Sequence, residues 1–343
     1  MSLTIRELDP PREQAWDRYV VAMPEGTFFH LAGWRRVIER AFRHPAHYLL
    51  AERDGAITGV LPLVHVKSRL FGNGLVSVPF CVYGGPIASD AASLQGLIDH
   101  SIALMKRLDT DLIEFRSRRP AAGEWSTRSN LYATFRRPIA GDEAANLKAI
   151  PRKQRAVIRK GIANGLTSRI DQDTDRFHRL YAESVRNLGT PVFSRRYLRV
   201  LVECFRDCCD ILTVEDEGEA VSAVLSFYFR DEVLPYYYGG TKRARQRAAN
   251  DFLYWELMRR AAARGIRIFD FGRSKFGTGS FDFKKNWGFT PEPLHYQYRV
   301  RPGRDIPDHN PLNPKYRLLI AAWKRLPLAV ANLLGPPIVR GIG

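Results

Sequence analysis

A repeat that spans most of the chain constrains the fold more than any other feature of the sequence. Tyr83-Gly84-Gly85 returns as Tyr238-Gly239-Gly240, and Ile113-Glu114-Phe115 returns as Phe269-Asp270-Phe271 at almost the same offset. Around both copies the periodicities recur in one order: helix, helix, three strands, helix, strand. Because only two copies are present, the long period indicates duplicated domains rather than a repeat array.

We therefore expect two domains and a tail. The repeat divides the 343-residue chain near Gly141 into residues 1–140 and 141–300, and each half is long enough to bury its own core. In each half the strands first follow one another directly and then resume after a helix. This order predicts a mixed α/β sheet, antiparallel at first and parallel later, with a ligand entering where neighbouring strands diverge.

The stretch 269–289, FDFGRSKFGTGSFDFKKNWGF, is the strongest candidate for a site. Its alternating apolar run ends at Gly272, and a loop with cationic and hydroxyl side chains follows, where α/β folds often place anion and substrate chemistry. A loop that only carries the backbone past a neighbour is the structural alternative. The first half continues its matching strand as residues 116–120, RSRRP, without the glycines or the Phe-Lys-Lys, so we expect any chemistry in the second half.

Charge and cysteine usage restrict the partners and the compartment. The formal net charge is +17 and the isoelectric point is about 10.0, which predicts anionic partners: phosphate, nucleic acid or an anionic membrane surface. The N-terminus lacks an apolar signal segment and no run is long enough to span a membrane, so we expect a cytoplasmic protein. The four cysteines form no CxxC pair and have no triad context, so we expect reduced, buried thiols, no metal and no covalent intermediate.

The composition changes after Val300. Prolines at 302, 307, 311 and 314 punctuate a linker, basic and apolar residues mix over 315–326, and an almost wholly apolar run occupies 328–334. This tail, residues 301–343, suits a basic amphipathic segment lying peripherally on the inner face of an anionic membrane, with Trp323 at the headgroups. A helix docked on the second domain, or a dimer contact, is the alternative.

The order of elements resembles the GNAT acyltransferase fold, and two copies in one chain resemble the Fem-type aminoacyltransferases and the wider FemAB-like group. The motif FDFG…FDFKKNWGF within 269–289 carries the resemblance most specifically, and residues 152–161 (RKQRAVIRKG) look like the basic helix that opens the second domain there. With its tail, the pattern resembles in particular FemAB-like proteins of exosortase (PEP-CTERM) exopolysaccharide loci. The resemblance covers about 28–300 and implies tandem duplicated GNAT-like domains.

The resemblance also implies a function. It is that of an acyltransferase or aminoacyltransferase forming an amide on an amine of a cell-envelope glycan or peptidoglycan precursor, with aminoacyl-tRNA or acyl-CoA as co-substrate and no permanently bound cofactor. Backbone N–H groups on a splayed strand would polarise the carbonyl, and a helix N-terminus would bind the leaving group. Two other functions stay open: an acetyl-CoA-dependent N-acyltransferase, and a non-catalytic binder of an anionic lipid-linked precursor or RNA.

The candidate catalytic residues are Lys284, Lys285, Asp270 and Tyr238. The Fem-type enzymes carry a functional lysine where Lys284 and Lys285 stand, and it would stabilise the oxyanion or neutralise a donor phosphate. Two solvated lysines at the start of a strand are the alternative. Asp270 would orient the incoming amine, or cap the loop as a structural aspartate. The three tyrosines 236–238 would form pocket wall and sheet core.

Binding residues are expected in three places around a site between the two halves. They are the turn after the strand, the helix start that replaces the family's phosphate loop, and the basic helix of the second domain. The replaced loop lacks the family's glycines, which weakens the match to CoA, while its arginines keep an anion site open. For the basic helix a solvated face is the alternative. The candidates are Arg273, Ser274 and Lys275; Arg245 and Arg247; Lys153, Arg155 and Arg159; and the wall residues Tyr236 and Tyr237.

Overall fold

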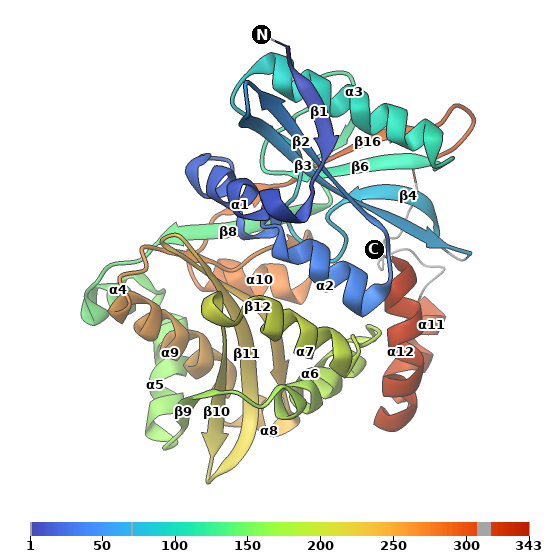
Figure 1. Cartoon of the computed structure of the whole chain (residues 1–343). Helices are drawn as coiled ribbons and strands as arrows, with labels where there is room; N and C mark the ends of the chain where they lie inside the picture. Colours follow the sequence, from blue (N-terminus) through green and yellow to red (C-terminus); the bar gives the residue numbers. More distant parts are fainter. Residues whose placement is uncertain (1, 70, 307–316, 343) are drawn as a thin grey trace. The chain divides into compact units, whose positions relative to one another are not determined.

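The chain folds into two units, each built on one mixed sheet. The computed structural model describes residues 2–69, 71–306 and 317–342 (Figure 1). Unit 1 comprises Met1–Leu131, Pro293–His309 and Arg340–Gly343, and unit 2 comprises Tyr132–Glu292 and Asn310–Val339. The predicted duplicated α/β fold is therefore confirmed.

Unit 1 has an eight-stranded sheet in the order β1-β2-β3-β4-β6-β16-β7, with β5 paired to β3. Strands β1 to β4 join antiparallel, and β6 lies parallel to β4 because a helix, α3, intervenes. The elements are β1 (Thr4–Glu7), α1 (Glu13–Ala22), α2 (Gly33–Phe42), β2 (Ala46–Arg53), β3 (Ala56–Ser68), β4 (Gly72–Ser77), β5 (Ile87–Ala88), α3 (Ala91–Arg107), β6 (Leu112–Ser117), β7 (Ser126–Arg128) and β16 (His295–Val300), with 3-10 turns at Pro10–Arg12 and Phe28–His30.

Unit 2 repeats the plan in the order β14-β8-β13-β12-β11-β10-β9, with β15 paired to β8. Again the early strands join antiparallel, and β13 lies parallel to β12 after a helix, α9. The elements are β8 (Tyr132–Pro138), α4 (Glu143–Ala149), α5 (Arg152–Ala163), β9 (Thr167–Asp171), α6 (Thr174–Leu188), α7 (Arg195–Cys204), β10 (Cys209–Asp216), β11 (Glu219–Phe229), β12 (Glu232–Gly240), α8 (Lys242–Gln246), α9 (Ala249–Ala263), β13 (Ile268–Asp270), β14 (Ser274–Lys275), α10 (Gly279–Asn286) and β15 (Pro291–Pro293), with a 3-10 turn at Arg206–Cys208.

The last strands of the two sequence halves are exchanged between the sheets. β8 ends the first half in sequence but pairs antiparallel with β13 of unit 2. β16 ends the second half but pairs antiparallel with β6 of unit 1. The compact units are therefore not consecutive segments of chain. The boundary expected near Gly141 falls after β8 and stays a prediction about the sequence repeat.

Helices α6 and α9 cover opposite faces of the unit 2 sheet. The ring of Tyr237 contacts Tyr181 of α6 at 5.5 Å between centroids, whereas that of its neighbour Tyr238 contacts Tyr254 of α9 at 5.9 Å. Successive strand residues point to opposite faces, so the two helices lie on the two sides of β12. On the α6 side a Cβ on Gly239 would lie 2.3 Å from the backbone nitrogen of Tyr181, so only glycine allows this close approach.

The tail forms two helices, α11 (Arg317–Arg325) and α12 (Leu328–Ile342). The prolines expected to punctuate the linker at 307, 311 and 314 lie outside the described residues. No helix within the described part of the chain combines the length and the apolarity that a membrane crossing requires. Of the cysteines only Cys81 is buried; Cys204, Cys208 and Cys209 are half-buried, which corrects the expectation that all four are core residues.

Candidate functional site

The unit 2 sheet opens between β12 and β13. β12 pairs with β11 along its length to Gly240, but it pairs with parallel β13 only at its first two residues. The register between β11 and β12 also shifts between Leu225 and Ser226, which makes Tyr236 an inserted bulge residue. A bulge leaves backbone groups outside the ladder. β12 thus parts from β13 and carries a bulge, as a splayed strand would, and its part in polarising a carbonyl stays a prediction.

In unit 1 the corresponding place is filled by the chain itself. After β4 ends, the amides of Gly84 and Gly85 both donate to the carbonyl oxygen of Arg116 at 3.0 Å. A Cβ on Gly85 would lie 1.9 Å from Oγ of Ser117, so the loop lies directly against the end of β6. The carboxylate of Asp90 caps the start of α3, and its negative charge would repel an anionic ligand at that helix N-terminus. These contacts leave no free Gly84 or Gly85 amide and place a carboxylate at the helix start.

Lys284 lies inside unit 2, on α10. The predicted alternative of two lysines at a strand start is wrong, because residues 279–286 form a helix. The side chain of Lys284 is 9% exposed, and its Nζ donates to the carbonyl oxygens of Gly272 at 3.0 Å and Arg273 at 2.9 Å. Burial lowers the pKa of Lys284 to about 7, against the opposing attraction of Asp270 and with a small further lowering by Arg273.

Lys285 has a different environment. Its side chain is exposed, with Nζ 5.8 Å from the ring centroid of Phe281. Consecutive residues of an α-helix point in directions about 100° apart, so only one of two adjacent lysines can face the sheet. The structure therefore separates two residues that the sequence left equivalent, and it brings Lys284 to the end of β13.

Asp270 is completely buried at the end of β13 and is held by the following loop and by β8. It accepts hydrogen bonds from the amide of Gly272 at 2.7 Å and from Oγ1 of Thr134 at 3.3 Å, and it pairs with Arg136 at 3.3 Å. Arg136 also pairs with Glu232. These contacts favour the structural alternative, in which Asp270 fixes the loop and does not touch the amine.

Sequence reasoning missed the contribution of β8 to this cluster. Thr134 and Arg136 alternate with the buried Phe135, so the period of two placed both on one face of a strand. That alternation was visible, but the strand was assigned to the first half. Its partner, β13, could not be read from the sequence.

The turn Arg273-Ser274-Lys275 lies against Tyr132 of β8. The Arg273 guanidinium and the Lys275 ammonium lie 5.0 and 5.7 Å from the centroid of the Tyr132 ring. Ser274 is 5% exposed, and its Oγ has no hydrogen-bond partner within the described parts of the chain. The predicted anion-binding turn thus holds an unsatisfied hydroxyl beside two cations.

The tyrosines of β12 divide between wall and core. Tyr237 shares a hydrogen bond of 2.8 Å with the hydroxyl of Tyr197 in an aromatic cluster under α6. Tyr236, in the bulge, lies 4.5 Å from Tyr237 between ring centroids and is half-buried. Tyr238 donates to Asn250, and burial raises its pKa, so its hydroxyl keeps its proton at neutral pH. The assignment of Tyr238 as catalytic stays a prediction.

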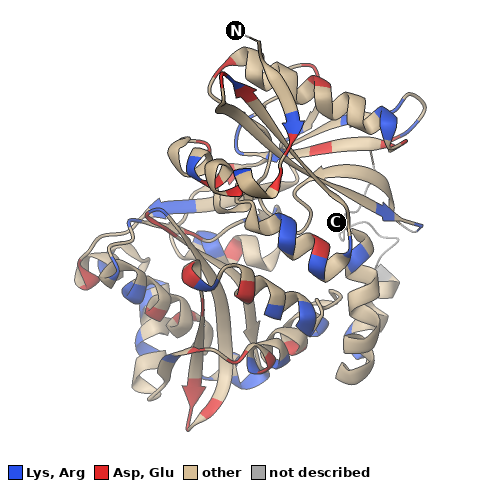
Figure 2. Cartoon of the chain, viewed as in Figure 1, with Lys and Arg blue, Asp and Glu red and all other residues tan. Residues whose placement is uncertain are grey.

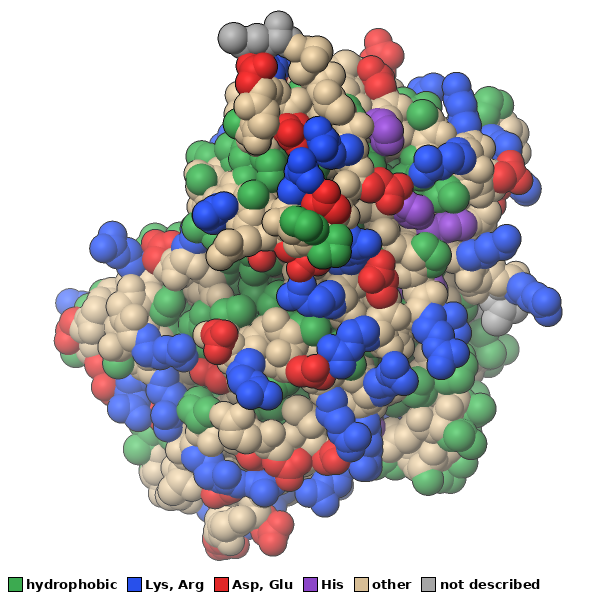
Figure 3. All heavy atoms as spheres, in the orientation of Figure 1, with side chains coloured by type: hydrophobic (Ala, Val, Ile, Leu, Met, Phe, Trp, Pro, Cys, Tyr) green, Lys and Arg blue, Asp and Glu red, His purple; other side chains and the backbone are tan. Residues whose placement is uncertain are grey.

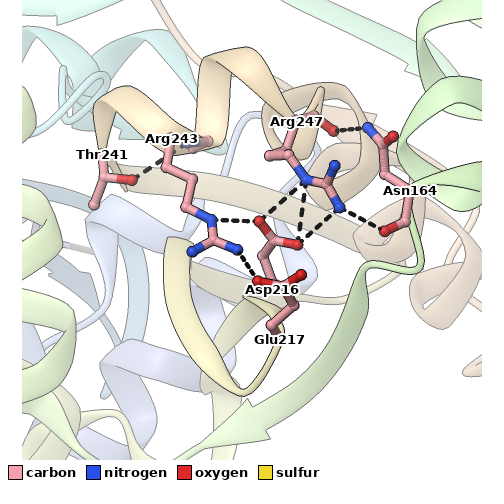
Figure 4. Close-up of polar contacts among 7 residues, drawn as sticks. Asn164, Asp216, Glu217, Thr241, Arg243 and Arg247 are labelled. Carbon is pink, nitrogen blue, oxygen red and sulfur yellow. Dashed lines mark hydrogen bonds and ion pairs between the residues drawn. The ribbon is translucent and has the colours of Figure 1, made fainter.

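Two of the three arginines in the expected phosphate loop are tied to acidic residues (Figure 4). The buried carboxylate of Asp216 accepts from Arg243 at 2.5 Å and from Arg247 at 3.1 Å, and Arg243 also reaches Glu217. The hydrogen bond from Arg243 is the largest cause of a lowered pKa for Asp216. Arg247 is thus occupied by a structural contact. Arg245 is exposed and has no ion pair within the described segments, so it is the arginine of this loop that remains available to an anion.

The basic helix of the second domain is α5. Its inward face carries Gln154 and Ile158, whereas Lys153 and Arg159 are exposed and Arg155 is half-buried. Within the described segments the predicted residues of α5 make no ion pair. Elsewhere Lys and Arg are spread over many elements and interleaved with acids (Figure 2). The predicted residues Lys153, Arg155 and Arg159 are thus without an ion pair in the described segments, as are Arg152 and Lys160 of the same helix.

A surface hollow of about 320 Å³ on unit 2 lies away from these groups. It contains no predicted site residue, so the candidate site is defined by the parted strands and the polar groups beside them. The hollow is lined by Gln172, Thr174, Arg199, Val202, Glu203, Arg206 and Cys209. The expected position of the site between the two halves stays a prediction.

Comparisons with known proteins agree with this geometry. Residues 148–285 match the family described as the acetyltransferase (GNAT) domain. Three solved structures are similar over most of the chain. FemX is 14% identical, with 92% of this chain and 100% of that chain covered and a TM-score of 0.67. The C-terminal domain of a putative lysylphosphatidylglycerol synthetase from Agrobacterium fabrum is 12% identical (85% of this chain and 92% of that chain covered, TM-score 0.55), and a tandem GNAT protein from the clavulanic acid biosynthesis pathway is also 12% identical (89% and 100% covered, TM-score 0.54). A search of curated proteins found no match.

The match covers β12, β13, Asp270 and Lys284, so the parted strands lie inside a domain of the acyltransferase class. The chain has a tandem GNAT-like fold, similar to that of FemX. At these identities the solved structures define the fold and leave the reaction partners open.

Proposed function

We propose that unit 2 transfers an acyl or aminoacyl group to an amine of a cell-envelope glycan or peptidoglycan precursor. The acceptor nitrogen attacks the acyl carbonyl carbon, an amide bond forms, and the bond from that carbon to the leaving group breaks. The leaving group departs with the electron pair of that bond and takes up the proton that the attacking amine loses, so it leaves as an alcohol or a thiol. The opening between β12 and β13 supports this proposal because it leaves backbone donors beside the place where an oxyanion would develop.

The single observation that carries the proposal is the environment of Lys284. A lysine ammonium has three N–H donors, and the carbonyl oxygens of Gly272 and Arg273 take two of them. The third donor can reach a substrate oxygen. A cation in a site of low polarity stabilises a developing oxyanion, or a donor phosphate, more strongly than one in water.

For the co-substrate, the GNAT match implies an acyl-CoA class of donor. Two observations point away from a conventional CoA pyrophosphate site: the loop 243–249 has no glycine, and Arg243 and Arg247 are held by Asp216. The unpaired cations of α5 suit a larger polyanion such as aminoacyl-tRNA, whose phosphates would contact Lys153, Arg155 and Arg159. We therefore propose aminoacyl-tRNA as the donor and acyl-CoA as the competing choice.

The experiment offers the full-length protein aminoacyl-tRNA or acyl-CoA with amine-bearing peptidoglycan and glycan precursors, and detects the amide by mass spectrometry. Lys284→Gln should lower kcat by about 100-fold, the effect of losing one oxyanion donor. Lys285→Gln, an exposed neighbour, is the matched control and should keep wild-type activity. Full activity in a folded Lys284→Gln variant would contradict the mechanism. Amide formation from acyl-CoA alone would instead select the acetyl-CoA-type function.

A non-catalytic binder would behave differently in the same assay. It would retain the precursor or RNA without turnover, and RNA affinity would fall steeply with salt whatever residue stands at 284. Binding without product from any donor would therefore select that alternative.

A further inference from the structure

The helices of the tail present large apolar side chains to solvent. Leu318 is 84% exposed and Leu319 is 67% exposed on α11, and Leu333 is 75% exposed on α12, with Leu334 and Val330 beside it at 45% and 37%. Figure 3 shows hydrophobic side chains along the lower right edge, where Figure 1 places these two helices. Elsewhere in the described chain, exposed large aliphatic side chains occur singly, as at Ile162. A concentration of this kind marks an interaction surface.

This exposure is not caused by undocked helices. In α12 the buried positions are Ala331, Gly335 and Val339, which recur every four residues on one face. A Cβ on Gly335 would lie 2.7 Å from the backbone nitrogen of Val192, so the helix backbone lies directly on the body of unit 2. Small residues therefore dock the helix and the leucines face outward.

Helix α11 is oriented in the same way. The side chain of Ile320 faces Gly189 at the end of α6, and Arg186 of α6 donates to the carbonyl oxygen of Lys324 at 3.4 Å. The indole Nε1 of Trp323 is buried, so Trp323 faces inward and does not reach a headgroup layer as expected from the sequence. Leu318 and Leu319 remain on the outer side.

The charge around this face selects its partner. Residues 317–342 contain no aspartate or glutamate, and Lys324 and Arg325 are exposed where α11 gives way to α12. A second copy of a chain with a net charge of +17 would be repelled, whereas an anionic surface would be attracted. The helices have nine and fifteen residues, fewer than the roughly 20 that a crossing requires, so a bilayer partner would be contacted from one side.

We propose that the outward face of α11 and α12 docks on an anionic lipid bilayer, with Leu318, Leu319 and Leu333 entering the boundary between headgroups and acyl chains. Arg325 lies at the lipid phosphates, and Lys324, whose Cε would lie 3.2 Å from a Cβ on Gly189 at the end of α6, adds positive charge at the edge of this face. Apolar insertion and basic residues act as two signals, the combination that holds a protein at a membrane surface.

The test uses the full chain and vesicles of phosphatidylglycerol and phosphatidylcholine, with vesicles of phosphatidylcholine alone for comparison, in a sedimentation assay. The wild type should bind the anionic vesicles. The triple variant Leu318→Ser/Leu319→Ser/Leu333→Ser should bind roughly tenfold or more weakly, and Lys324→Gln/Arg325→Gln should lose about fivefold per charge on anionic vesicles only. Because all five residues are exposed, unchanged thermal unfolding is expected in both variants.

Ile162→Ser removes an equally apolar, 51% exposed side chain from α5 and is the matched control; it should bind like the wild type. Two results would overturn the proposal. One is equal vesicle binding by the wild type and the triple variant. The other is a wild-type dimer in light scattering that the triple variant converts to a monomer, since a second copy would then cover this face.

Discussion

Nζ of Lys284 donates to the carbonyl oxygen of Arg273 at 2.9 Å and so ties α10 to the loop that ends β13. The same loop is held from its other side by Asp270, which accepts the amide of Gly272. One lysine and one carboxylate, both buried, thus fix the backbone beside the opening between β12 and β13. The two residues have separable consequences for activity and for stability.

The pH dependence of transfer should report the protonation state of Lys284. If its ammonium stabilises the oxyanion, kcat falls as pH rises through about 7, because the proton is lost there. Lys284→Arg, whose guanidinium stays charged, should extend activity to higher pH even if its rate is lower. The measurement is kcat against pH at saturating acceptor, with Lys285→Gln as the control that keeps the wild-type profile. A rate that rises through pH 7 and needs a neutral Lys284 would make it a general base.

Folding stability should depend on pH for the same reason. The pKa of Lys284 is about 7 in the folded protein and ordinarily 10.5, so between these values the unfolded chain binds more protons and the free energy of unfolding rises with pH. Each unit of pKa difference corresponds to about 1.4 kcal/mol. Over this range the free energy of unfolding of the wild type should therefore rise by a few kcal/mol, roughly, relative to that of Lys284→Met. Urea unfolding of both proteins between pH 6.5 and 9.5 measures the gain. Parallel curves would show that burial does not shift this lysine.

Asp270→Asn should destabilise the protein by about 3 kcal/mol, because it leaves the buried Arg136 and Lys284 with less negative charge while keeping the shape of the side chain. Arg136 keeps Glu232, so the loss should lie at the low end of the range for broken buried pairs. Asp282→Asn, at an exposed position of α10, should cost under about 1 kcal/mol. Chemical unfolding at pH 7 separates the two. If the Asp270→Asn protein were stable but inactive, Asp270 would have a catalytic role and not a structural one.

Arg247 and Arg245 should contribute to different properties, Arg247 to stability through Asp216 and Arg245 to donor binding. Asp216→Asn releases Arg243 and Arg247 and should lower the thermal midpoint, since a buried acceptor of two guanidinium groups becomes neutral. Arg245→Ala should leave the midpoint unchanged and weaken donor binding. Calorimetry and donor titration on both variants give the comparison. If Arg247→Ala weakened donor binding without changing the thermal midpoint, Arg247 would be a donor-binding residue and not a structural one.

Gly239→Ala should cost at least about 1–3 kcal/mol, because the added Cβ would meet the backbone of α6 at Tyr181. Gly279→Ala is the matched substitution, since a Cβ there meets nothing within 4 Å at the start of α10, and it should change stability by about 1 kcal/mol or less. Thermal unfolding distinguishes the pair. Equal midpoints would mean that α6 can move away from β12.

Much of the fold could be predicted because local patterns repeat. The return of Tyr-Gly-Gly and of the apolar run near Phe269 identified two copies of one sheet, and the periodicities placed most helices and strands. The helix at 279–286 was missed because its aromatic residues, alternating with charge, imitate a strand. Within 269–289 the structure brings Lys284 under the electrostatic influence of Asp270, and the role of this stretch as the site stays a prediction.

The sequence by itself determined the duplication, the class of fold, the elaboration of the second copy and the basic, apolar character of the tail. Only the tertiary structure decided that β8 and β16 exchange sheets, because the period of a strand reveals its faces and not its partner. It also buried Lys284 while leaving Lys285 exposed, and it paired Arg247 with Asp216. These outcomes depend on which distant segment lies opposite a side chain, and burial and ion pairing are set by that neighbour and not by the residue alone.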